Sequence, residues 1–126
     1  MITATEVQEQ EALMEYCQRF AQRVPALALL FHIPNGEKRE PSTAARLKRM
    51  GVKPGIPDLF LPVPMQGSHG LWIELKRMGG KPTAIQEAWH GALRQQGYAV
   101  VVAAGWHNAA AAILSYLEVD LEAGGF

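Results

Sequence analysis

Two short apolar segments each carry side chains suited to phosphate chemistry. The first, residues 55–61, contains Asp58 directly after a proline, and the second, residues 70–76, contains Glu74 and Lys76 two positions apart. Side chains alternate between the faces of a strand, so Glu74 and Lys76 point the same way if the second segment is extended. The sequence thus offers two carboxylates and an ammonium group within 19 residues of chain.

The interval between the two segments predicts that they form a hairpin. Residues 62–69 are rich in Pro and Gly, which suits a wide loop joining antiparallel strands. We expect this pairing to bring Asp58 beside Glu74. An E-x-K pattern on a strand is also typical of a solvated polar face or a cross-strand ion pair. Asp58, however, opens a run that is otherwise apolar, where packing does not account for a carboxylate.

Two converging carboxylates repel each other unless a positive charge lies between them. Hard divalent cations with oxygen ligands, such as Mg²⁺ or Mn²⁺, meet that need. A cation of this kind polarises a phosphoryl oxygen and lowers the pKa of a bound water, while a neighbouring lysine orients the water or neutralises developing charge. Asp58, Glu74 and Lys76 therefore predict metal-dependent phosphodiester hydrolysis.

The pattern Pro57-Asp58, a spacer and Glu74-Leu75-Lys76 resembles the PD-(D/E)XK nuclease signature. Further segments resemble one branch of that superfamily, the VRR-NUC domain, in the small stand-alone form common in phages and prophages, and the resemblance covers roughly residues 6–117. The segments are Ile33-Pro34-Asn35-Gly36, Ala44-Ala45-Arg46-Leu47-Lys48 to Gly51-Val52, Gly55 to Leu59, Gly70 to Lys76, Gln86 to Trp89, and Gly97-Tyr98.

The resemblance implies a restriction-endonuclease-like α/β core, a central mixed sheet flanked by helices, in a Mg²⁺- or Mn²⁺-dependent DNA endonuclease. It also implies a homodimer that acts like a Holliday junction resolvase, since two symmetric sites match a twofold junction. The Leu75 carbonyl and Glu6 are further candidate metal ligands. Flap, fork or nicking activity, a restriction-like defence role, and a non-catalytic DNA-binding subunit stay open as alternatives.

A helical pattern covers about residues 3–23, with Thr3 or Thr5 as its cap. Glu6 and Glu9 share a face near its beginning, where acidic side chains also complement the helix dipole. Because related enzymes supply a metal-binding carboxylate from the first helix, the resemblance makes Glu6 the first candidate and Glu9 the second.

The net charge is zero, but residues 38–81 hold nine basic and three acidic side chains, a local net charge of +6. Concentrated positive charge favours binding to the phosphate backbone of a nucleic acid, although a run of basic residues is often only a solvent-exposed face. Asn35, in Asn35-Gly36, either makes a turn or contacts phosphate. The predicted DNA-binding residues are Asn35, Lys38, Arg39, Arg46, Lys48, Arg49 and Lys53.

Other elements follow from apolar spacing and turn residues. We expect a strand over 27–33, a helix over 43–50 capped by Ser42 or Thr43, a helix over 83–96, a strand buried on both faces over 98–103, and a helix from Asn108 to about 117. The helix over 83–96 is predicted to bury Ile85, Trp89, Ala92 and Leu93. Its Gln86 fits a capping box with Thr83, whereas the resemblance places a glutamine here at the active-site rim.

Composition bounds the remaining choices. At 126 residues the chain predicts one domain over 1–126, with a frayed tail over about 119–126. No apolar run reaches membrane-helix length and no secretory segment opens the chain, so we expect no membrane partner and a cytoplasmic location in a bacterial or phage-infected cell. The one cysteine, Cys17, is expected in the core, and the four histidines lack the spacing of a zinc site.

Overall fold

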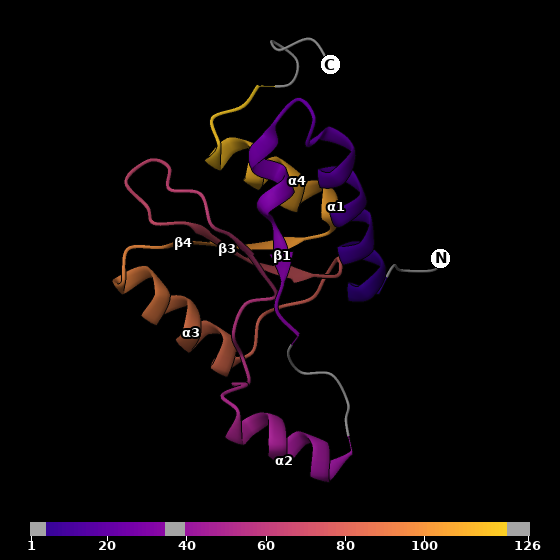
Figure 1. Cartoon of the computed structure of the whole chain (residues 1–126), viewed down its shortest axis with the longest axis vertical. Coiled ribbons are helices and arrows are strands. Elements are labelled where there is room, and N and C mark those ends of the chain that lie inside the picture. The colour runs from indigo at the N-terminus through magenta and orange to yellow at the C-terminus, as the bar shows by residue number, and fades with distance from the viewer. Residues whose placement is uncertain (1–4, 35–39, 121–126) are drawn as a thin grey trace.

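The computed structural model describes residues 5–34 and 40–120 as helices around a four-stranded sheet (Figure 1). The elements in chain order are α1 (Glu6–Phe20), the 3₁₀ helix η1 (Pro25–Leu29), β1 (Phe31–His32), α2 (Pro41–Arg49), β2 (Leu59–Leu61), β3 (Leu71–Lys76), α3 (Ala84–Gln95), β4 (Ala99–Ala104) and α4 (Trp106–Tyr116). In the described ranges no helix is long and apolar enough to cross a membrane.

The sheet has the strand order β1-β2-β3-β4 and is mixed. β1 pairs antiparallel with β2, β2 pairs antiparallel with β3, and β3 pairs parallel with β4. The predicted hairpin is therefore confirmed, with Leu59 opposite Ile73 and Phe60 opposite Trp72. Extending that register by one residue places Asp58 opposite Glu74.

Helices cover both faces of the sheet. α1 and α4 pack together on one face, and α3 packs against β4 on the other (Figure 1). Leu59, Leu61, Leu71, Ile73 and Leu75 point toward α1 and α4 and are fully or almost fully buried. This alternation leaves Asp58, Trp72, Glu74 and Lys76 to the α3 side, as the period of two predicts.

Helix starts follow local capping chemistry. Thr5 and Thr83 each form a capping box, with Gln8 and Gln86 as the reciprocal partners. The expected starts of two helices were wrong in detail. α2 begins at Pro41 with Glu40 as its cap, because proline suits the first helical position. α4 begins at Trp106 after Gly105, and Asn108 lies inside its first turn and donates to the Ala104 carbonyl (2.7 Å).

Two strand predictions also need correction. The segment predicted as a strand over 27–33 forms η1 and then a strand of only two residues, because Pro25 at the first position favours a local turn. The apolar strand β4 is not buried on both faces; it lies at the end of the sheet and most of its residues are only partly buried. Residues 121–126, most of the predicted frayed tail, lie outside the described residues.

Candidate active site

Asp58 and Glu74 meet on the α3 side of the β2–β3 hairpin. Asp58 lies immediately before β2 and Glu74 lies in β3, and their carboxyl groups hydrogen-bond to each other. Asp58 Oδ2 also accepts the backbone N–H of Leu75 (2.9 Å), so the strand that carries Glu74 also orients Asp58. The carboxylate pair that the sequence predicts is thus present.

Glu74 is a buried acid whose pKa is far from its ordinary value. Its exposed fraction is 0%. Burial is the largest cause that raises the pKa of Glu74, to about 9, and the hydrogen bond and charge of Asp58 raise it further. Lys76 acts in the opposite direction and lowers it. In this form of the protein Glu74 therefore carries a proton at pH 7.

Helix α3 supplies hydrogen bonds to both oxygens of Glu74. Gln86 Nε2 donates to Oε2 (3.3 Å), and His90 Nε2 lies 3.2 Å from Oε1. Gln86 Oε1 accepts the Thr83 backbone N–H (2.8 Å), so the same amide completes the capping box and reaches Glu74. Gln86 therefore completes the predicted capping box and also contacts Glu74, while its place at an active-site rim stays a prediction.

The face of α3 that meets the sheet is not the predicted apolar one. Ile85 and Ala92 are exposed, Trp89 and Leu93 are partly buried, and the buried residue of this helix is His90. The prediction was wrong because the sheet opposite α3 presents a buried carboxyl group, which needs polar partners. Trp89 instead holds the loop before β2, through Nε1 to the Pro54 carbonyl (3.0 Å).

Lys76 ends β3 with an exposed fraction of 6%, on the same face as Glu74. The positive charge of Lys76 lowers the pKa of the Glu74 carboxyl group. The backbone carbonyl of Lys76 accepts the N–H of Gly105, which fixes the end of β3 against the beginning of α4. A nearly buried lysine whose charge acts on Glu74 completes the predicted set of three side chains.

Comparison with known proteins identifies the family of the chain. The family model of the VRR-NUC domain matches residues 4–106. The chain belongs to the VRR-NUC domain family. A solved structure described as a "VRR_NUC domain protein" is 34% identical, covers 94% of this chain and 93% of its own, and superposes with a TM-score of 0.79. A search of curated proteins finds no match. The α/β fold is thus restriction-endonuclease-like, and the family indicates a nuclease.

The two first-helix carboxylates of this VRR-NUC chain have different surroundings. Glu9 has an exposed fraction of 8%, and its Oε1 accepts the backbone N–H of Trp106 (3.2 Å), so it caps α4 from α1. Glu6 is exposed, and its charge contributes to the raised pKa of Glu74. These surroundings favour Glu6 as the carboxylate that faces the site.

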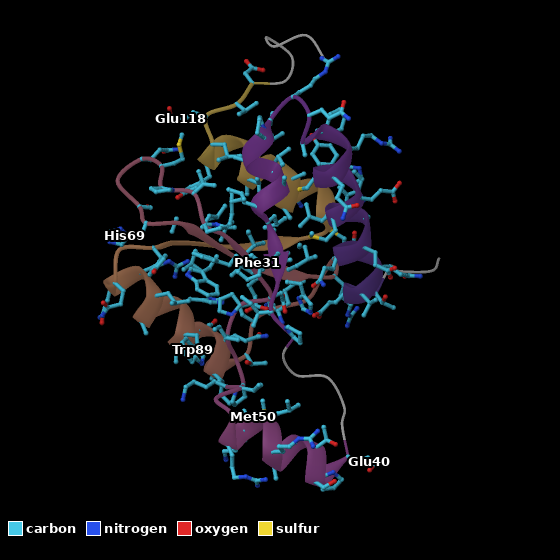
Figure 2. The ribbon with its side chains drawn as sticks, viewed as in Figure 1. Phe31, Glu40, Met50, His69, Trp89 and Glu118 are labelled. Carbon is cyan, nitrogen blue, oxygen red and sulfur yellow. The ribbon has the colours of Figure 1, made fainter. Side chains whose placement is uncertain are left out.

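The predicted phosphate contacts fall into two groups. Arg46, Lys48 and Arg49 lie on α2, and Lys53 follows it; all four are exposed. Figure 2 labels Glu40 and Met50 at the two ends of α2, which stands away from the sheet beyond α3. Asn35, Lys38 and Arg39 lie outside the described residues. The structure thus places the described basic side chains on a projecting helix and the loop after it.

The residues around Asp58 and Glu74 fit a hard divalent cation with partial protein ligation. Both side chains offer oxygen atoms, and the charge of Asp58 raises the pKa of Glu74, a repulsion that a cation between them would relieve. Among residues 5–34 and 40–120 no group of three or more His, Cys, Asp or Glu side chains is arranged as a metal site. Mg²⁺ keeps several waters and substrate oxygens as ligands, so two carboxylates and a backbone carbonyl suffice.

Sequence reasoning missed His90. It lies four residues after Gln86, and residues at that spacing share a helix face. The signal was therefore present, but the expected apolar stripe of this helix did not include either residue. Only the strand partner of α3, a buried glutamate, makes this polar face the buried one.

Proposed function

We propose that this VRR-NUC protein is a metal-dependent DNA endonuclease of the PD-(D/E)XK type, selective for branched DNA. The observation that carries the proposal is the pairing of buried Glu74 with partly buried Asp58, with Lys76 on the same sheet face as Glu74. Burial of Glu74 and the neighbouring Asp58 disfavour the state in which both carboxyl groups are ionised, and a bound cation would favour that state.

The side chains have separate roles in this proposal. Asp58 and Glu74 would hold one or two Mg²⁺ or Mn²⁺ ions, together with the Leu75 carbonyl and Glu6. Such an ion supplies Lewis-acid polarisation of the scissile phosphate and a water of lowered pKa. Lys76 orients the attacking water and stabilises the negative charge that develops on the phosphoryl oxygens. Gln86 donates to Glu74 at the rim of the site.

DNA would be gripped through its backbone. The described exposed cations of the 46–53 segment suit phosphate oxygens, which position a duplex without reading its sequence. The predicted Asn35, Lys38 and Arg39 contacts belong to the same proposal. Because nothing in the described fold corresponds to a sequence-reading module, we infer that DNA shape selects the substrate.

A homodimer is part of the proposal. One site per subunit would cut one strand, and two sites related by a twofold axis match the symmetry of a four-way junction. We therefore propose a Holliday-junction-resolvase-like activity. Cutting of flaps or forks at higher rates than junctions would assign the enzyme to a different branched substrate with the same chemistry.

The test compares cleavage of four-way junction, flap, fork, single-stranded and linear DNA in Mg²⁺, Mn²⁺ or chelator. We expect cleavage only with metal, fastest on the junction, and no product from Asp58→Asn, Glu74→Gln or Lys76→Met. Glu11→Gln, an exposed carboxylate on α1, is the matched control and should cleave normally. Binding without any product in every metal would instead identify a non-catalytic DNA-binding subunit.

A further inference from the structure

His90 lies inside the fold at a position that the proposed roles leave unused. Its exposed fraction is 3%, and its Nε2 atom lies 3.2 Å from Glu74 Oε1. Gln86, one turn earlier on the same face of α3, donates to the other oxygen of Glu74. A single helix thus holds both oxygens of the carboxyl group that reaches from β3.

The two donors are not equivalent. Gln86 also completes the capping box of α3, which sets its amide orientation: Oε1 faces the Thr83 N–H and Nε2 faces Glu74. His90 lies further along the helix and its ring is buried against Glu74. In the tautomer that carries its proton on Nε2, the His90 ring donates an N–H to Glu74 Oε1.

We propose that His90 is a positioning residue for the divalent cation site. Its Nε2–H holds the ionised Glu74 carboxylate so that the free lone pairs of this group stay directed toward Asp58. The inference rests on the proposed function, because it assigns His90 to the same metal site. Mg²⁺ demands near-ideal geometry, and a ligand carboxylate fixed by hydrogen bonds meets that demand at lower entropic cost.

Three substitutions separate the hydrogen bond from the volume of the ring. His90→Gln places an amide N–H near the former Nε2 position, whereas the shorter His90→Asn cannot reach Glu74. His90→Leu fills space without any donor. His107→Asn is the matched control, because His107 is exposed on α4 and stacks on Trp106 with ring centroids 3.8 Å apart.

The primary readout is Mn²⁺ binding without DNA, measured by the loss of the free-ion electron paramagnetic resonance signal. We expect His90→Asn and His90→Leu to bind Mn²⁺ about 10- to 100-fold more weakly, the range typical of lost hydrogen bonds to metal ligands. His90→Gln should stay within about threefold of wild type, and His107→Asn should match it. Thermal unfolding in chelator verifies that each variant is folded. We call His90→Asn and His90→Leu the donor-free variants, because neither places a donor against Glu74, and one folded donor-free variant is enough for the test.

A kinetic readout adds a second criterion. At low Mn²⁺ the donor-free variants should cleave slowly, and saturating Mn²⁺ should restore much of kcat while the KM for DNA stays unchanged. Wild-type Mn²⁺ affinity in a folded donor-free variant would overturn the role of His90. So would equal losses in His90→Gln and His90→Asn, because packing and not the donor would then matter. The proposed function fails separately, if the wild-type protein neither binds Mn²⁺ nor cleaves DNA.

Discussion

Replacing Glu74 by glutamine should stabilise the metal-free protein at neutral pH. Glu74 has a pKa of about 9 in the fold against 4.5 for an ordinary glutamate, so the folded state binds one more proton than the unfolded state between these values. The contribution of Glu74 to the free energy of unfolding is fully present below pH 4.5 and is lost as pH rises toward 9. Glutamine is a neutral side chain of the same shape and avoids this loss.

The size of the effect follows from the two pKa values. Each pH unit between them costs the wild-type protein up to about 1.4 kcal/mol relative to Glu74→Gln. At pH 7 the difference reaches about 3 kcal/mol, and it vanishes near pH 4.5. For a domain of this size about 3 kcal/mol corresponds to a rise in Tm on the order of 10 °C.

Urea unfolding in chelator from pH 4.5 to 9 measures this difference directly. The comparison of wild type with Glu74→Gln cancels the titration of groups that do not interact with Glu74, and Glu11→Gln on the exposed face of α1 should show no such slope. A difference that does not change with pH would refute the buried, protonated state of Glu74. A variant less stable than wild type at pH 7 would refute it as well.

Four further results are expected. Mn²⁺ binding at pH 7 should release close to one proton per site, detected by calorimetry in buffers of different ionisation enthalpy, because the cation displaces the proton of the carboxyl pair. Glu9→Ala should destabilise the fold by about 1–3 kcal/mol in urea unfolding through the lost α4 cap, whereas Glu6→Ala should keep stability and weaken Mn²⁺ binding. Gly55→Ala should be destabilised by about 1–3 kcal/mol in the same assay, because φ is +90° and the new Cβ would lie 2.3 Å from Ile85 Cγ2. Neutralising the three basic residues of α2, Arg46, Lys48 and Arg49, should weaken the salt dependence of DNA binding. The slope of the logarithm of the binding constant against the logarithm of the salt concentration, measured by fluorescence anisotropy, should become shallower by about two to three.

The sequence was most informative where side chains alternate with a period of two. Leu71, Ile73 and Leu75 define the core face of β3, and that choice alone sends Glu74 to the opposite face. Asp58 stands at the start of an apolar strand, and the hairpin pairing then predicts that it lies opposite Glu74. Local chemistry thus located the carboxylate pair, and the family resemblance identified the fold.

Predictions failed where the burial of a segment depends on its neighbour in space. The face that α3 buries is set by Glu74, from a distant strand, so apolar spacing within the helix pointed to the wrong residues. The apolar run of β4 lies at a sheet edge, because no further strand follows in the described sheet. The side chain that accepts the first N–H of α4, from Trp106, is Glu9, which is 97 residues away in sequence.

The site is assembled by the same contacts that build the fold, and this is why we propose a cation as the counterpart of its two acids. The Leu75 N–H orients Asp58, and the α3 capping box orients Gln86 toward Glu74. These contacts hold the two carboxyl groups close together, so their repulsion disfavours the state in which both are ionised. A proton or a cation between them would compensate that repulsion. Exchange of one for the other is therefore the step by which this fold would turn an unfavourable buried pair into a phosphodiester-cleaving centre.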